Sequence, residues 1–339
     1  MFKNKCLCNL MLVTLLSSVA VAQAQTASTE PVLSLSKGSG QAYPNRPVRI
    51  IVAFAPGGAN DIVTRVVAQK LAETWGQSIV VDNRGGAGGN IGGDLAAKAS
   101  PDGYTLFMTS GSIVSANPHM YRNMPFNPEK DFAAITMVAS GPQIMVVNPS
   151  FAAKTLKDFI AMAKAKPKTF TMGTAGFGTQ THLAGENFMH TAGMDAVHVP
   201  YKGEGPALTD LLGGQINFVP ANLAAAIGQV QQGKLRGLAV TSLQRLKQLP
   251  DVPAAAETLP GFENLGWFGL LTPSGTPKAV IDKIHADTAK ALQAPDIRNR
   301  YEQLGMAPVG DSPAQFAKTI KEETVRWAKI VRERNLTVN

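Results

Sequence analysis

Cysteine and aromatic residues are scarce in this chain of 339 residues. It has two cysteines, Cys6 and Cys8, and 6% aromatic residues. So few aromatic side chains argue against a platform on which nucleic-acid bases stack. At 45% hydrophobic and 17% charged residues, the composition is that of a globular protein and excludes disordered, collagen-like and multi-span membrane chains.

The N-terminal segment has the three regions of a secretory signal peptide. Lys3 and Lys5 precede an apolar run over Leu10–Ala22, which small residues follow at Ala22 and Ala24. This run is too short and too polar to span a bilayer. We therefore predict a cleavable signal peptide over residues 1–24 and a periplasmic location.

Cleavage would remove both cysteines, which excludes a disulfide framework, a cysteine-ligated metal and a thiol nucleophile from the mature chain. The net charge would fall from +8 to +6 with the loss of Lys3 and Lys5. The remaining lysines and arginines are scattered, without a run of five. We therefore expect no nucleic-acid partner.

The mature chain alternates short β-branched runs with helical stretches after a flexible leader at residues 25–41. Strands are predicted at Val48–Phe54, Ser78–Val81, Tyr104–Met108, Gln143–Val147, Phe170–Met172, Val197–Tyr201, Ile216–Val219, Leu235–Thr241 and Trp267–Leu271. Helices are predicted at Ile62–Trp75, Leu156–Lys166, Thr181–Ala192 and Lys278–Leu292. This order indicates an α/β fold with largely parallel sheets.

The number of strands favours two lobes rather than one small sheet. We expect lobe 1 to comprise residues 42–140 and 266–339, and lobe 2 residues 141–265. The apolar stretches Ala134–Asn148 and Asn264–Thr272 are candidates for segments that cross between them.

Several enzyme and cofactor motifs fail when they are tested. The glycine-rich run Gly85–Gly93 lacks the i, i+2, i+5 spacing of a dinucleotide-binding turn. Gly228–Lys234 resembles the start of a phosphate-binding loop, but Leu235 stands where Ser or Thr should hold magnesium. We expect no cofactor.

A metal site is also not expected. His182, Glu186 and His190 share one helix face, but at ~1.5 Å per residue they span about 12 Å, too far for one ion to reach all three. We interpret Glu186 and His190 as part of a solvated helix face.

A different pattern recurs where predicted strands end. Five strands lead into small, polar residues that expose the backbone, at 54–61, 109–112, 173–179, 200–203 and 220–222. In open α/β sheets, ligands bind at the carboxyl ends of strands. Glycines there let N–H groups approach a ligand, and the N-terminus of the next helix adds partial positive charge. The pattern predicts a site for a small anion such as a carboxylate.

At these residues the chain resembles a known family. The segments AFAPGGANDIVTRVVAQKL, VVDNRGGAGGNIGGDLAAKASPDGYTLFMTS, TAGFGTQTHLAGENF and VHVPYKGEGPALTDLLGGQI are similar to those of the Bug family. These are extracytoplasmic solute-binding receptors of tripartite tricarboxylate transporters. The resemblance covers about residues 42–335 and implies a two-lobed periplasmic binding protein of the second topological type, with the ligand cleft between the lobes.

The resemblance also implies the residues of the site. Lobe 1 would hold the ligand carboxylate through the loop after the first strand, with the 109–112 segment beside it, and lobe 2 would close with the 174–179 loop and the helix that follows. The implied ligand-binding residues are Phe54, Ala55, Gly57, Gly58, Asn60, Asp61, Thr109, Ser110, Ser112, Thr174, Gly176, Gly178, Thr179, His182, Tyr201 and Asn222. Backbone amides, hydroxyls and ordered water would bind the carboxylate.

Two positions depart from the family pattern. Asn60 stands where threonine is common, which puts the usual ligand in doubt. Gly85 stands where proline is common, and there we expect only a change in loop stiffness.

Three interpretations of function stay open on the sequence. The first is a non-enzymatic receptor, a monomer that binds a di- or tricarboxylate, an aromatic acid or an amino acid and delivers it to a membrane transporter. An amino acid would need a carboxylate in the cleft for its ammonium group, and Asp61 is the one candidate. The alternatives are a periplasmic enzyme, with Asp61, His182 or Tyr201 as its base, and a sensor module for a membrane kinase.

Overall fold

The computed structural model describes residues 43–338. The predicted signal peptide, the predicted leader and both cysteines therefore lie outside the described residues.

The first part of the described chain alternates strands and helices and ends in a long strand. Its elements are β1 (Val48–Val52), α1 (Ala59–Trp75), β2 (Ile79–Asn83), η1 (Ala87–Gly89), α2 (Asn90–Ala97), β3 (Thr105–Ser110), η2 (Ser112–Ala116), α3 (Asn117–Met120), α4 (Pro128–Asp131) and β4 (Phe132–Val147). The remaining elements are α5 (Leu156–Ala165), β5 (Thr171–Thr174), α6 (Gln180–Ala192), β6 (Val197–Pro200), α7 (Glu204–Leu212), β7 (Phe218–Asn222), α8 (Leu223–Gln231), β8 (Arg236–Val240), η3 (Ala255–Glu257), β9 (Leu265–Pro273), α9 (Lys278–Gln293), α10 (Pro295–Gln303), β10 (Ala307–Pro308) and α11 (Pro313–Arg334).

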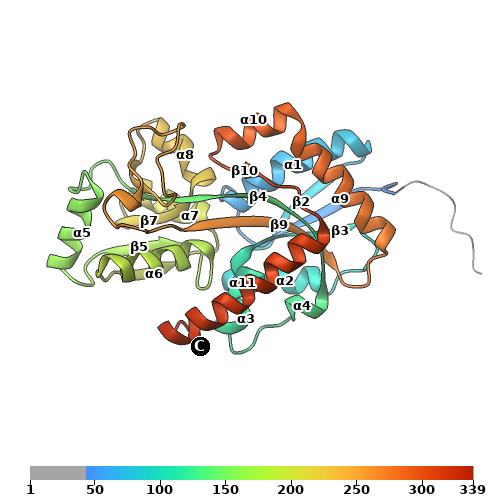
Figure 1. The fold of residues 1–339 in the computed structure, drawn as a ribbon, viewed down its shortest axis with the longest axis horizontal. Coiled ribbons are helices and arrows are strands. Elements are labelled where there is room, and N and C mark those ends of the chain that lie inside the picture. The colour runs from blue at the N-terminus through green and yellow to red at the C-terminus, as the bar shows by residue number, and fades with distance from the viewer. Residues whose placement is uncertain (1–42, 339) are drawn as a thin grey trace, which may run out of the picture. The chain divides into compact units, whose positions relative to one another are not determined.

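The strands follow the order β2-β1-β3-β9-β4-β7-β5-β6, and β8 and β10 pair with β4. Residues 132–142 of β4 pair with β9, whereas residues 143–147 pair with β7 and β8. Strand β4 therefore links a first group of strands (β1, β2, β3, β9 and β10) to a second group (β5, β6, β7 and β8). We call these the first and second halves of the sheet. Figure 1 shows β4 and β9 running side by side between the two groups.

The prediction of an α/β fold is confirmed, but the prediction of largely parallel sheets holds only for part of the strands. The pairs β1–β2, β1–β3, β5–β6 and β5–β7 are parallel. Every pair made by β4 or β9 is antiparallel. For β3–β9 and β4–β9 the reason is that β9 returns from the second half and inserts between β3 and β4, against the direction of both.

Strand β1 shows why the sheet is covered on both faces. Val48, Ile50 and Val52 pack into one buried cluster with α1, and Ile51 packs into a second one with Phe107 and Phe316. A strand without an exposed face is typical of a parallel sheet between helical layers. In the second half, Phe159, Phe188 and Phe218 form a third cluster. Both groups of strands thus hold their carboxyl-end loops on a packed core.

Candidate functional site

The loop after β1 connects the sheet to α1. Gly58 is the N-cap of α1 in an extended conformation, and Asn60 and Asp61 follow in its first turn. The Asp61 carboxylate accepts hydrogen bonds from the Gly57 N–H (3.1 Å) and from Arg65 Nε (3.0 Å). Asp61 therefore fixes the loop, and it is not among the residues that line the pocket described below.

Asn60 has a different role from Asp61. Its side chain is 2% exposed, and its Nδ2 donates to the Met108 carbonyl at 3.3 Å. Its Oδ1 has no hydrogen-bond partner. A buried carbonyl oxygen without a partner is unusual, because an unpaired buried polar group destabilises the fold by about 1–3 kcal/mol.

The end of β3 contributes hydroxyl groups. Thr109 is fully buried, and its Oγ1 donates to the Ser110 carbonyl. The Ser110 and Ser112 hydroxyls lie 3.2 Å apart. Of these three residues, Ser110 is the one that faces the pocket described below.

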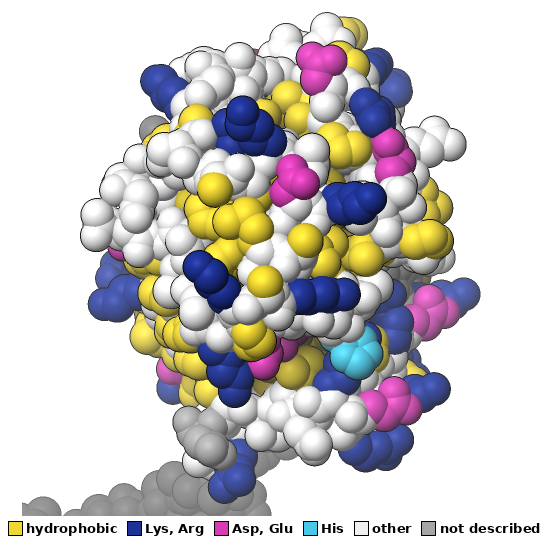
Figure 2. Space-filling view, turned by 90° about the vertical axis from the view of Figure 1, so that its left-hand side faces the viewer, with side chains coloured by type: hydrophobic (Ala, Val, Ile, Leu, Met, Phe, Trp, Pro, Cys, Tyr) yellow, Lys and Arg dark blue, Asp and Glu magenta, His cyan; other side chains and the backbone are white. Residues whose placement is uncertain are grey.

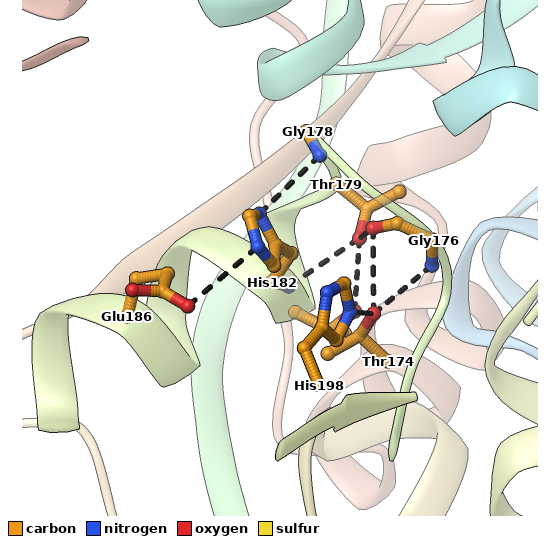
Figure 3. Close-up of polar contacts among 8 residues, drawn as sticks. Thr174, Gly176, Gly178, Thr179, His182, Glu186 and His198 are labelled. Carbon is orange, nitrogen blue, oxygen red and sulfur yellow. Dashed lines mark hydrogen bonds and ion pairs between the residues drawn. The ribbon is translucent and has the colours of Figure 1, made fainter. Parts of the chain in front are cut away.

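In the second half of the sheet, the loop from β5 to α6 turns sharply on glycines (Figure 3). The Gly176 N–H donates to Thr174 Oγ1, and the Thr179 hydroxyl donates to the Gly176 carbonyl at 2.6 Å. Thr179 is also the N-cap of α6 and accepts from the His182 N–H. Gly178 has φ of +72°, and an added Cβ would lie 2.2 Å from Asn117 Oδ1, so only glycine fits there.

His182 and His198 pack behind this loop (Figure 3). His182 Nδ1 accepts from the Gly178 N–H, and His198 Nε2 lies 2.6 Å from Thr174 Oγ1. Burial lowers the pKa of His182 to about 3, to which the neighbouring His198 contributes, and burial lowers the pKa of His198 to about 4. Both imidazoles are thus neutral at pH 7. Glu186 Oε1 lies 3.7 Å from His182 Nε2, and burial raises the pKa of Glu186.

The loop after β6 brings a buried carboxylate to the site. Glu204 is the first residue of α7 and is 4% exposed. Its Oε1 accepts from the N–H (2.6 Å) and from Nδ2 (2.9 Å) of Asn222, and its Oε2 accepts from the Ala59 N–H (2.9 Å). Burial raises the pKa of Glu204, and the three N–H donors oppose that shift by stabilising the carboxylate. Glu204 thus connects the second half to the N-terminus of α1 in the first.

These loops enclose one pocket, which residues of both halves line. The lining residues are Phe54, Gly58, Asn60, Ser110, Ala175, Thr179, Gln180, Thr181, Glu204, Asn222 and Phe268. The centre of a water-sized sphere can occupy about 10 Å³ of this pocket, which is about the room that one water molecule needs. In the described conformation, then, the loops are packed closely against one another.

The structure brings six of the predicted binding residues to the pocket lining: Phe54, Gly58, Asn60, Ser110, Thr179 and Asn222. The others are not among its lining residues: Ala55, Gly57, Asp61, Thr109, Ser112, Thr174, Gly176, Gly178, His182 and Tyr201. Tyr201 is one example, since its hydroxyl donates to Asp210 Oδ2 at 2.6 Å.

Sequence reasoning missed Ala175, Gln180, Thr181, Glu204 and Phe268. Glu204 is the most consequential, because Asp61 had been the one candidate for a carboxylate in the cleft. Glu204 directly follows Gly203, the last residue of the strand-end loop 200–203, and this position was the signal by which the sequence could have indicated it.

The expectation that Gly85 affects only loop stiffness needs correction too. A Cβ there would lie 2.6 Å from the Lys202 carbonyl, so Gly85 permits the close contact between the halves.

A much larger hollow, of about 1020 Å³, lies between α11 and the segment 118–134. None of the predicted binding residues lines it. Its position away from the strand-end loops is why we place the candidate site in the smaller pocket.

The charges around the site are sparse. No Lys, Arg or His is among the pocket-lining residues, and Glu204 is the one ionisable group there. Over residues 43–338, no group of three His, Cys, Asp or Glu side chains is placed to hold a metal ion. On the face of the molecule in Figure 2, Lys and Arg side chains are dispersed among neutral and acidic ones. None of the described helices is long and apolar enough to cross a membrane.

Comparisons with known proteins find relatives in sequence and in fold. The chain is 37% identical to BugT of Bordetella pertussis over 297 residues. The aligned segment covers 87% of this chain and 91% of BugT. The structure of the periplasmic binding protein BugD matches with a TM-score of 0.84 and 33% identity, over 87% of this chain and 99% of that one. MatC of Rhodopseudomonas palustris with bound malate matches with a TM-score of 0.81 and 31% identity, over 85% of this chain and 100% of that one.

The fold is that of a periplasmic solute-binding protein. A model of the tripartite tricarboxylate transporter family receptor matches residues 63–336. The chain belongs to this receptor family, the Bug or TctC family. The resemblance seen in the sequence is thus confirmed.

Proposed function

We propose that this protein is a non-catalytic periplasmic receptor that binds a small carboxylate in the pocket between the two halves and passes it to a membrane transporter. The observation that carries the proposal is that strand-end loops of both halves line one pocket. A ligand held by both halves favours the conformation in which they are in contact.

Helix N-termini supply the attraction for a carboxylate. Gly58, Thr179 and Asn222 are the N-caps of α1, α6 and α8, and all three line the pocket. The N-terminus of a helix carries partial positive charge and free N–H groups, so it binds anions without a basic side chain. The Ser110, Thr179 and Thr181 hydroxyls add further hydrogen-bonding groups.

Contacts between the halves support closure around the ligand. The Ala55 N–H donates to the Lys202 carbonyl at 3.0 Å, and Gln180 Nε2 donates to the Trp267 carbonyl at 2.6 Å. We propose that residues 42–140 with 266–339 and residues 141–265 act as two lobes that separate to admit the ligand. Their connection through β4 and β9 would be the hinge.

The three bases that the sequence suggests for an enzyme lie outside the pocket lining, which favours a receptor. Asp61 is paired with Arg65, His182 accepts from the Gly178 N–H, and Tyr201 donates to Asp210. The family itself is a receptor family.

A thermal-shift screen would test the proposal. The purified protein is unfolded, dialysed to remove bound solutes and refolded, and then mixed with mono-, di- and tricarboxylates, aromatic acids and amino acids. A ligand at 100 times its Kd should stabilise the native state by about 2.7 kcal/mol. At least one carboxylate should raise the melting temperature saturably and be recovered unchanged. If no member does so with cooperatively folded protein, or if the ligand is converted, the proposal is wrong.

A further inference from the structure

Glu204 offers hydrogen-bond acceptors to the pocket that it lines. Each ionised carboxylate oxygen can accept about two hydrogen bonds. Oε1 accepts two, both from Asn222, whereas Oε2 accepts one, from the Ala59 N–H. Oε2 therefore retains acceptor capacity at the wall of the pocket.

The carboxylate of Glu204 is held in this position by a chain of side-chain amides. Asn264 Nδ2 donates to Gln143 Oε1, and Gln143 Nε2 donates to Asn222 Oδ1 at 3.0 Å. Asn222 Nδ2 then donates to Glu204 Oε1. Each amide in the chain is oriented by the one before it, so the carboxylate is a built part of the pocket and not a loose surface group.

Two further side chains present acceptors without partners. Asn60 is 2% exposed, and its Oδ1 lacks a partner because its Nδ2 donates to the Met108 carbonyl. Gln180 is arranged in the same way, with Nε2 on the Trp267 carbonyl and Oε1 unpaired. In both side chains the amide group that contacts a backbone carbonyl must be the NH2 group, because only a donor can bond to a carbonyl oxygen. The other end is therefore the amide oxygen.

The pocket thus combines acceptors with one formal negative charge and no positive side chain. A ligand with two carboxylates would bring like charges next to Glu204, and burial makes such repulsion stronger than in water. An ammonium group has the opposite charge and three N–H donors. The N-terminus of α6, at Thr179 to Thr181, stays available for a carboxylate, whereas the first N–H of α1 is bonded to Glu204.

We propose that the ligand is an amino acid, with its protonated amino group bound by Glu204 and Asn60 and its carboxylate at the N-terminus of α6. This inference rests on the proposed receptor function and narrows the class of its ligand. It also makes Asn60 and Glu204 the residues that determine specificity for amino acids over carboxylic acids without an amino group.

Matched pairs of ligands would test this proposal without a mutation. Refolded protein is titrated calorimetrically with L-alanine and propanoate, L-aspartate and succinate, L-glutamate and glutarate, L-leucine and 4-methylpentanoate, and L-phenylalanine and 3-phenylpropanoate. In the pair that binds, the amino acid should bind at least tenfold more tightly than its partner without the amino group. Equal or tighter binding of the acid without the amino group overturns this inference and leaves the receptor function intact. If no pair binds while another carboxylate does, the inference is overturned as well, whereas failure of every carboxylate would overturn the proposed function.

The variant Glu204→Gln tests the residue itself. It keeps the size of the side chain and removes the charge, so amino acid affinity should fall at least tenfold while affinity for the acid without the amino group is unchanged or rises. Glu322→Gln, at a side chain that is 64% exposed, is the control and should bind like the wild type. Equal losses for both members of a pair would show that Glu204 only maintains the structure of the pocket, and this would overturn its assignment. If Glu204→Gln does not fold, the matched pairs on the wild type still decide the ligand class.

Discussion

At the scale of single residues, the glycines around Glu204 determine how closely the two halves can approach. An ideal Cβ on Gly205 would lie 2.4 Å from the Pro56 carbonyl oxygen, and one on Gly203 would lie 2.8 Å from the Ala55 nitrogen. Both obstacles are backbone atoms of the opposite half, which cannot rotate away as a side chain can. Alanine at Gly205 should therefore hold the halves apart without disturbing either one.

We expect Gly205→Ala to weaken ligand binding at least tenfold and to change the melting temperature by no more than a few degrees. Titration calorimetry with the ligand from the screen and thermal unfolding would measure the two effects. Gly228→Ala is the matched control, since this helical glycine in α8 has no atom within 4 Å of the added Cβ. Wild-type affinity in Gly205→Ala would show that the contact with Pro56 is not needed for binding.

At the scale of elements, α6 and β6 each place a histidine, the buried His182 and the half-buried His198, behind the β5–α6 loop, and this pair should make stability depend on pH. Burial lowers the pKa of His182 to about 3 and that of His198 to about 4, from an ordinary value of 6.5. Below pH 6.5 the unfolded chain binds protons at these two sites and the folded chain does not. The free energy of unfolding should therefore fall as the pH drops from 6.5 towards 4.

Replacement of one histidine isolates this effect. We expect His198→Gln to lose less stability than the wild type between pH 6.5 and 5, by about 1 kcal/mol after allowance for the partial exposure of His198. Denaturant unfolding at several pH values would measure it. His190→Gln, at an exposed position of α6, the helix that carries His182, should follow the wild-type profile. Identical profiles for all three proteins would mean that the histidines do not resist protonation.

At the scale of the whole molecule, the proposed opening and closing can be tested by a covalent link. The only cysteines of the sequence, Cys6 and Cys8, lie in the predicted signal peptide, so an introduced pair would have no competitor in the mature chain. A Cβ on Gly58 would lie 3.4 Å from the Glu204 Cβ, close to the ~3.5–4.5 Å of disulfides. These two residues come from opposite halves.

We expect oxidised Gly58→Cys/Glu204→Cys protein, prepared without ligand, to take up ligand at least 100-fold more slowly than the same protein after reduction. The reason is that the disulfide would hold the halves together and block entry to a pocket of this size. Rapid-mixing fluorescence or calorimetry in the presence and absence of dithiothreitol would compare the two states. Uptake at equal rates would rule out separation of the halves as the route of entry.

The sequence alone determined the α/β class, the receptor family and several of the loops that line the candidate pocket. These follow from local patterns, because strands and helices differ in hydrophobic period and because strands that end in small polar residues expose backbone groups. Asn60, Ser110, Thr179 and Asn222 could be found in this way, and all four line the pocket.

Only the tertiary structure decided which polar side chains hold the loops in place and which line the pocket. Asp61 and Glu204 are both acidic residues in strand-end loops. Asp61 is neutralised by Arg65 one turn away in its own helix, whereas Glu204 reaches across to the Ala59 N–H of the other half. That contact joins residues 145 positions apart, and no local pattern in the sequence specifies it. The carboxylate in the pocket is therefore a product of how the two halves come together.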